Sequence, residues 1–182
     1  MRGMSLVIER SPSSFSTLDE EAIRTHFLLQ LNGHYEGNAT TEELGLEIYS
    51  LGSTTWRRED LQKGLEPDEC YYITQEAQVR GKTTFDLNTD PAPDLAIEID
   101  LTSSSLNRLS IYAALGVREI WRYDGQDLKI YILVEGEYQQ QEQSSVLPIL
   151  SRSDVLVFLN KRSTLGENAL IREFRQWLHQ QD

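Results

Sequence analysis

The sequence predicts an α/β fold, a mixed β-sheet flanked by helices. Stretches in which apolar and polar residues alternate are interspersed with stretches of helical periodicity, in the order β-α-β-β-β-α-β-β, and further helices follow. The chain has 182 residues, of which 39% are hydrophobic and 25% charged, as expected for a folded domain with its own core. We expect residues 1–182 to form a single domain, with the C-terminal helices, about 153–180, as an appendage.

Three strands and one helix are predicted in the first half of the chain. The helix, residues 18–32, has acidic side chains in its first turn and an apolar stripe before Gly33. Alternating apolar residues indicate the strands, and the third has Asp68 at its entrance, directly after Pro67. The polar run "QEAQVRGKTT" is expected to be a loop. The three strands are residues 5–9, 43–52 and 65–74.

The second half of the chain begins with the predicted strand "PDLAIEID". A helix follows, with Ser103 or Ser104 as its cap and Gly116 as its stop. Its inward-facing residues are Leu106, Leu109, Ala113 and Leu115. Two strands, "VREIWRY" and "DLKIYILV", are then joined by an Asp-Gly hairpin turn, and the polar run "YQQQEQSS" comes after them. The segment "SDVLVFLN" and residues 167–180 are predicted to be the C-terminal helices.

The strand at residues 93–100 has acidic residues on one face and aliphatic residues on the other. Asp94, Glu98 and Asp100 share a face, because alternate residues of a strand project to the same side, about 6.5–7 Å apart. Carboxylates at this spacing repel one another unless a cation compensates, and a hard divalent metal such as Mg2+ is one such cation. A strand at the edge of the sheet, with its acids in water, is the alternative explanation.

A second acidic position supports the metal hypothesis. Asp68 opens one predicted strand and Glu98 lies on the next one along the chain. Two neighbouring strands could therefore bring one Asp and one Glu onto a common metal ion.

These residues resemble a known nuclease pattern. A Pro-Asp pair followed by an acidic residue on the next strand is the signature of the PD-(D/E)XK nuclease superfamily. The segments "GLEPDECYYI", "DPAPDLAIEID" and "SLNRLSIYAALGVREIW" resemble the Uma2-type endonucleases, also grouped as DUF820. The likeness runs from about Leu51 to Leu133 and implies a restriction-endonuclease-like fold that cleaves DNA with Mg2+ or Mn2+.

The resemblance also implies roles for individual residues. Asp68 and Glu98 correspond to the metal-binding acids, and the backbone carbonyl of Ile99 to a further ligand. Asp94 corresponds either to a ligand or to a carboxylate that orients a water molecule. An outlying acid of the superfamily would correspond to Glu20 or Glu21, for which a solvated helix N-terminus is the plainer explanation.

The sequence departs from the superfamily pattern at its lysine. Asp100 stands two residues after Glu98, where the pattern has Lys. In Uma2-like members the basic residue lies on the following helix, which corresponds here to Arg108. An arginine can bind phosphate through two parallel hydrogen bonds but cannot act as a general base, so a metal-activated water would be the nucleophile. Lys82 is a rival cation, although solvation of its loop also explains it.

Composition limits the possible partners and setting. The formal net charge of -12 repels nucleic acid at long range, so binding to DNA requires a local basic rim, for which Arg57, Arg58 and Lys82 are candidates together with Lys63 and Arg80. A solvated surface explains these residues equally well. The single cysteine excludes an internal disulfide and suits a reducing cytoplasm, and the N-terminal residues indicate neither a signal peptide nor a membrane span.

Two functions remain open from the sequence. The first is a metal-dependent endonuclease that hydrolyses DNA phosphodiester bonds and needs no organic cofactor. The second is a nuclease scaffold that has lost its activity and works as a dimeric interaction or regulatory module. Asp100, the acidic net charge and a shorter lead-in before "SLVIERSPSS" than the family usually has favour the second function. A homodimer is expected, because a dimer suits the cleavage of two strands under the first function and is part of the second.

Overall fold

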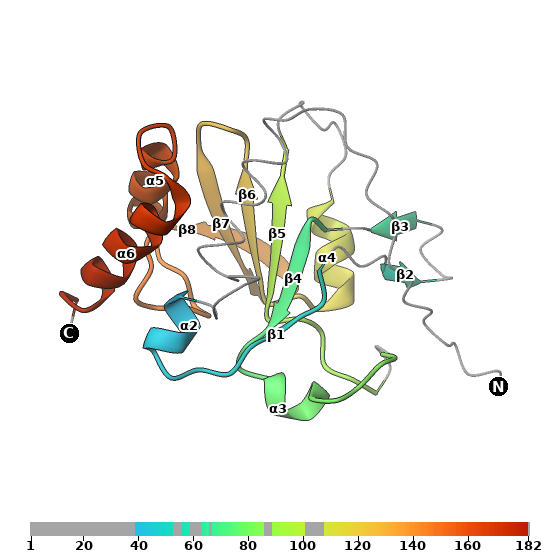
Figure 1. Ribbon diagram of the computed structural model, residues 1–182. Coiled ribbons are helices and arrows are strands. Elements are labelled where there is room, and N and C mark those ends of the chain that lie inside the picture. The colour runs from blue at the N-terminus through green and yellow to red at the C-terminus, as the bar shows by residue number, and fades with distance from the viewer. Residues whose placement is uncertain are drawn as a thin grey trace, which may run out of the picture.

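A mixed β-sheet forms the centre of the protein in the computed structural model, which describes residues 39–52, 56–58, 63–65, 67–85, 89–100 and 108–181 (Figure 1). Within this part of the chain the sheet has six strands in the order β1-β4-β5-β6-β7-β8. Their bounds are β1 Tyr49–Ser50, β4 Glu69–Tyr72, β5 Leu95–Ile99, β6 Glu119–Tyr123, β7 Leu128–Val134 and β8 Glu137–Gln141. β2 (Trp56–Arg58) and β3 (Lys63–Leu65) form a separate antiparallel pair.

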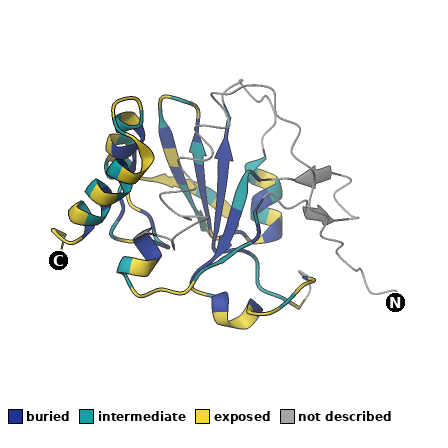
Figure 2. Cartoon of the chain, in the orientation of Figure 1, coloured by how far each residue is buried: buried dark blue, intermediate teal, exposed yellow. Residues whose placement is uncertain are grey.

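The middle of the sheet combines antiparallel and parallel pairing. β5 is antiparallel to β4 and parallel to β6, and the helix α4 (Leu109–Leu115) lies between β5 and β6 in the chain. β5 is buried along its whole length (Figure 2), as is usual for a strand with neighbours on both edges and helices on the faces. The predicted α/β fold with a mixed sheet flanked by helices is confirmed.

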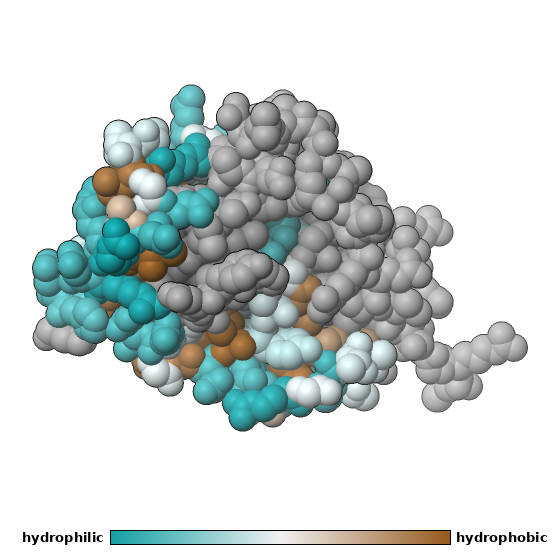
Figure 3. Space-filling view, in the orientation of Figure 1, coloured by the Kyte–Doolittle hydropathy of each residue, from teal (hydrophilic) through white to brown (hydrophobic). Residues whose placement is uncertain are grey.

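The two C-terminal helices cover one face of the sheet. α5 (Arg152–Lys161) and α6 (Glu167–Leu178) lie side by side against β6 and β7 in Figure 1, and their outward side is largely hydrophilic in Figure 3. Their apolar side packs on the odd-numbered residues of β5, all of which are buried. The helix residues in this core are Val155, Phe158, Leu159, Leu170, Phe174 and Leu178.

The other face of the sheet packs against α4. Tyr112 and Leu115 of this helix contact a cluster formed by even-numbered strand residues, namely Cys70, Tyr72, Ala96 and Ile120. Glu98 is the next even-numbered residue of β5 after Ala96, and its side chain accordingly reaches α4. The strand alternation therefore places the acidic face of β5 under this helix.

Most predicted elements in the described residues are confirmed. These are the strands that correspond to β4, β5, β6 and β7 and the helices that correspond to α4, α5 and α6. Gly116 ends α4 as predicted, with a φ of 80° that is in the left-handed region, where glycine has no steric penalty. The capping serines Ser103 and Ser104 lie outside the described residues, as do the predicted strand at 5–9 and the helix at 18–32.

Two predictions of secondary structure were wrong in part, and one strand was not predicted. Residues 43–52 contain only the two-residue strand β1, and the short helix α2 (Ala39–Glu43) ends where the predicted strand begins. The predicted loop at 75–84 contains the helix α3 (Glu76–Val79). The polar run after β7 forms β8, an edge strand whose side chains are mostly exposed. Backbone pairing to β7 holds β8 in place without an apolar pattern, so periodicity did not reveal it.

None of the helices in the part of the chain that the structure describes is both long and apolar enough to cross a membrane.

Candidate active site

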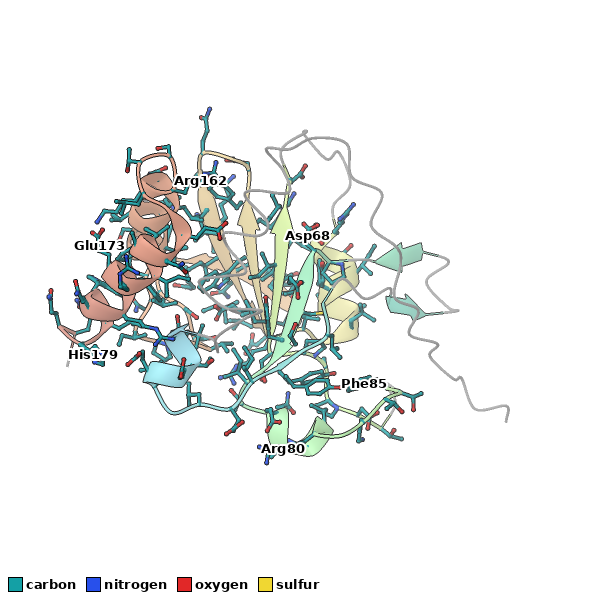
Figure 4. The ribbon with its side chains drawn as sticks, viewed as in Figure 1. Asp68, Arg80, Phe85, Arg162, Glu173 and His179 are labelled. Atoms are coloured by element: carbon teal, nitrogen blue, oxygen red, sulfur yellow. The ribbon has the colours of Figure 1, made fainter. Side chains whose placement is uncertain are left out.

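Asp68 lies where β4 begins, beside the C-terminal end of β5 (Figure 4). Its backbone N–H donates to the carbonyl of Ile97 at 3.1 Å, as in a continuation of the β4–β5 ladder. One oxygen of its carboxylate, Oδ2, then accepts the backbone N–H of Ile99 at 2.6 Å. The side chain thus takes the place of a backbone carbonyl in the ladder, which holds the carboxylate at the end of β5.

Glu98 lies on the same end of β5 and is only 5% exposed. Its Oε2 accepts a hydrogen bond from Nη1 of Arg108 at 2.8 Å, and its Oε1 accepts one from the hydroxyl of Tyr112. Both donors come from α4 and its N-cap position, and because they are four residues apart they lie on one face of the helix. The buried carboxylate is therefore held by one cation and one neutral donor.

Burial and charge keep the Tyr112 hydroxyl protonated. Its pKa lies well above the usual value, first because the side chain is buried and then because the Glu98 carboxylate is adjacent. Tyr112 is thus a hydrogen-bond donor at all physiological pH values. Tyr112 was not predicted from the sequence as a partner of Glu98, although its four-residue spacing from Arg108 places both residues on one face of the helix.

The structure brings Asp68, Glu98 and the backbone of Ile99 together at one end of β5. Asp68 precedes Glu69, whose Cα partner on β5 is Ile97, so Asp68 lies level with the Ile97–Glu98 segment. In a strand the N–H and C=O of one residue point to the same edge, and the N–H of Ile99 points to Asp68. The Ile99 carbonyl consequently lies on the Asp68 side as well.

The chemistry of these groups fits a hard divalent metal ion. Two carboxylates and a carbonyl are all oxygen ligands, and Mg2+ is commonly held by one or two carboxylates and several waters. Among the described residues no three side chains of His, Cys, Asp or Glu come together in a way that could hold a metal. Asp68 and Glu98, with the Ile99 carbonyl, are the oxygen groups that lie at this end of β5.

Asp94 is not brought to this pair. It lies at the opposite end of β5, where Oδ2 accepts the backbone N–H of Ile73 at 2.8 Å and that of Gln75 at 3.0 Å. Four residues of strand, about 13 Å, separate it from Glu98. Asp94 is fully buried and holds the turn after β4, so the structure gives it a place in the scaffold rather than beside the two carboxylates.

Two residues of the predicted basic rim, Arg80 and Lys82, lie away from the pair. Lys82 is bonded to Asp90, and Arg80 to Glu76, near α3 at the other end of the sheet from Asp68 (Figure 4). Arg57, Arg58 and Lys63 belong to the β2–β3 pair, and the positions of their side chains lie outside what the structure describes. Glu20 and Glu21 also lie outside the described residues.

One basic residue at this end of the sheet was missed from the sequence. Arg122 of β6 is the Cα partner of Glu98 on β5, and its Nη2 donates to Oδ2 of Asp100 at 3.1 Å. Arg122 is the one basic residue of the strand "EIWRY", and this was the signal that could have identified it.

Comparison with known proteins agrees with this fold. The family model Uma2, described as "Putative restriction endonuclease", matches residues 13–160. The fold is similar to that of a crystal structure of a protein from Anabaena variabilis ATCC 29413, described as a putative nuclease belonging to DUF820. That match has a TM-score of 0.50 and 15% sequence identity and covers 80% of this chain and 84% of the other. No curated protein matches. Since the family model spans most of the chain and includes Asp68, Glu98 and Arg108, the protein belongs to the Uma2 family.

Proposed function

We propose that this protein is a metal-dependent endonuclease that hydrolyses DNA phosphodiester bonds. The observation that supports this proposal best is the convergence of Asp68, Glu98 and the Ile99 backbone at the C-terminal end of β5, with Arg108 bonded to Glu98. A bound Mg2+ or Mn2+ would supply an activated water and neutralise negative charge on the scissile phosphate. The family description as a restriction endonuclease agrees with a DNA substrate.

The residues of the site have distinct roles in this proposal. Asp68 and Glu98 hold the metal, and each is oriented by the protein before any ligand arrives. The N–H of Ile99 fixes Asp68, whereas the hydroxyl of Tyr112 fixes Glu98. Such fixed partners reduce the reorganisation needed when the substrate binds.

Arg108 is suited to contact the phosphate. Its side chain is 38% exposed although one of its N–H groups is bonded to Glu98, so further donors of the guanidinium can reach a ligand. Arginine is always protonated at neutral pH and binds phosphate oxygens in a bidentate manner. It would therefore stabilise the charge that develops on the phosphate but would not accept a proton.

The proposal is tested with supercoiled plasmid and Mg2+ or Mn2+. The wild-type protein is expected to nick or linearise the plasmid, and EDTA is expected to abolish this reaction. Asp68→Asn and Glu98→Gln are expected to lose activity at least about a hundredfold, because each removes a charged ligand. Asp68→Asn keeps an oxygen for the Ile99 N–H, so the local fold is disturbed little.

A matched control and a second readout make the result specific. Glu137→Gln removes one acid from the exposed surface of β8 and is expected to leave cleavage unchanged. Titration calorimetry with Mn2+ is expected to show binding to the wild type and to Glu137→Gln but none to Glu98→Gln. Equal cleavage by all variants would identify a contaminating nuclease and refute the proposal.

The alternative, a scaffold without activity, is supported by the state of Glu98. Both of its oxygens are already engaged, one by the cationic Arg108, and Asp100 stands in place of the motif lysine. Under this alternative no metal binds and no plasmid is cleaved, while the fold and a homodimer are retained. Light scattering after size-exclusion chromatography measures the dimer independently of metal binding and plasmid cleavage.

A further inference from the structure

The residue that stands in place of the motif lysine is itself paired with a cation. Asp100 follows β5 directly, and its Oδ2 accepts a hydrogen bond from Nη2 of Arg122 on β6 at 3.1 Å. The parallel register makes Arg122 the Cα partner of Glu98. An arginine thus lies beside Glu98 on the neighbouring strand. The motif lysine would stand two residues after Glu98, at position 100.

Arg122 and Glu98 project from the same face of the sheet. Ile120, two residues before Arg122 on β6, packs in the core cluster beneath α4, and alternate residues of a strand share a face. Lys129 on β7 is the Cα partner of Arg122 and shares this face too. Glu98, Arg122 and Lys129 therefore form a row across β5, β6 and β7, in which Arg122 is next to Glu98 and Lys129 is next to Arg122.

The Arg122 side chain is oriented and also reachable. Its side chain is 28% exposed and that of Asp100 is 18% exposed, so the pair lies at the surface of this end of the sheet. One described hydrogen bond to Asp100 uses one of the five N–H donors of the guanidinium. Lys129, which is exposed, adds a second positive charge to this row.

We propose that Arg122 takes over the role of the missing motif lysine by binding the substrate phosphate next to Glu98, and that Asp100 is its positioning residue. This inference rests on the proposed endonuclease function and adds a second cation, besides Arg108, to the same site. In this arrangement the motif lysine, which would stand two residues after Glu98 on β5, is replaced by Arg122 on the neighbouring strand. Asp100, at the lysine position, anchors Arg122.

The test removes the cation without leaving an unpaired acid. The double variant Asp100→Asn/Arg122→Gln replaces the ion pair by two neutral side chains, and Asp100→Lys/Arg122→Gln returns a cation from the motif position on β5. Arg172→Gln is the matched control, because Arg172 is an exposed arginine on α6, which covers the other face of the sheet. Thermal unfolding verifies that each variant is folded.

Two readouts are measured for each protein. The first is the affinity for a short DNA duplex with Ca2+ as the divalent ion, over a series of salt concentrations. The neutral double variant is expected to reduce the slope of log K against log salt by about 0.9, the value for one lost phosphate contact. The second is plasmid cleavage with Mg2+, expected to fall about a hundredfold in the neutral double variant and to recover at least in part in Asp100→Lys/Arg122→Gln.

Each outcome decides the inference. A wild-type slope and wild-type cleavage in the neutral double variant would overturn it, and so would a loss that Asp100→Lys does not restore or that Arg172→Gln shares. If the wild-type protein binds DNA but does not cleave it, the proposed hydrolysis fails and the salt slope alone decides the role of Arg122. If the wild-type protein binds no DNA, both proposals fail.

Discussion

The guanidinium of Arg108 lies 2.8 Å from Oε2 of Glu98, so a cation already occupies an oxygen that the proposed metal ion would need. A divalent ion at this oxygen competes with Arg108 for it. The Arg108–Glu98 pair would therefore link metal binding to phosphate binding, since a metal ion that displaces Arg108 from Glu98 would free the guanidinium for a phosphate.

Replacing Arg108 tests this competition. Arg108→Ala is expected to reduce plasmid cleavage about 100- to 1,000-fold, the usual effect of removing one stabilising donor from a transition state. The affinity for Mn2+ is expected to stay equal or to become tighter, because the competing cation is gone. Arg108→Lys should retain part of the activity. Weaker Mn2+ binding in Arg108→Ala would show instead that the arginine only supports the fold of the metal site.

Tyr112 tests how much the buried hydrogen bond to Glu98 contributes to stability. Tyr112→Phe is expected to lower the free energy of unfolding by about 1.5–3 kcal/mol, the range for a hydrogen bond to a charged group. Tyr138→Phe is the matched control, because the Tyr138 hydroxyl donates to the neutral carbonyl of Val117 on the same side of the sheet. It should cost only about 0.5–1.5 kcal/mol. Urea unfolding measures both, and equal losses would contradict the difference in acceptor charge.

Glu119 tests a second buried carboxylate with a purely structural role. It is fully buried on β6 and accepts hydrogen bonds from the indole of Trp121 and from the segment 144–146. Glu119→Gln turns one acceptor into a donor that faces these donors, so a loss of about 2–4 kcal/mol is expected in urea unfolding. Amide exchange at Val146 should become faster at the same time. The exposed change Glu137→Gln is the control, and a similar loss there would refute the assignment.

Gly116 tests the end of α4, the helix that carries Arg108 and Tyr112. Its φ of 80° is unfavourable for other residues, and an added Cβ would lie 3.8 Å from the Cβ of Ala92, an ordinary contact. Gly116→Ala is therefore expected to cost about 1–2 kcal/mol through backbone strain alone. Gly116→Asn should cost less, since asparagine tolerates this conformation better. Urea midpoints of the two variants should differ in this order, and the reverse order would point to a steric clash.

Asp124 tests the pH dependence of the turn between β6 and β7. The backbone N–H groups of Asp127 and Gln126 hold the pKa of its carboxyl below the usual value. A lowered pKa means that the charged group stabilises the fold above its unfolded pKa, about 3.9, and that this contribution is lost as the pH falls through the folded pKa. Asp124→Asn should therefore be slightly less stable than the wild type at pH 7, and the difference should shrink as the pH falls below the unfolded pKa. A constant difference in urea midpoint across this range would exclude the effect.

The predicted strands show which parts of the fold a pattern can reveal. β5 and β6 combine aliphatic residues with turn residues at their ends, and both were predicted closely. β1 and β8 were not, because each lies at an edge of the sheet and is held by backbone hydrogen bonds to one neighbour. Backbone pairing leaves no trace in side-chain periodicity.

The sequence by itself determined the acidic face of β5 and the helix opposite it. Alternation places Glu98 on the face that carries Ala96, and the Pro-Asp segment places Asp68 at the start of a neighbouring strand. These predictions hold because the geometry of a strand and of a helix is periodic along the chain.

Only the tertiary structure decided which charged groups meet. It separates Asp94 from Glu98 by the length of β5, keeps Lys82 with Asp90, and brings Arg122 beside Glu98 through the parallel pairing of β5 and β6. The register between strands and the packing of α4 depend on contacts between residues distant in sequence, which no local pattern encodes. The position of Arg122 beside Glu98 is for this physical reason a property of the folded sheet, whereas Arg108 could be named from the sequence.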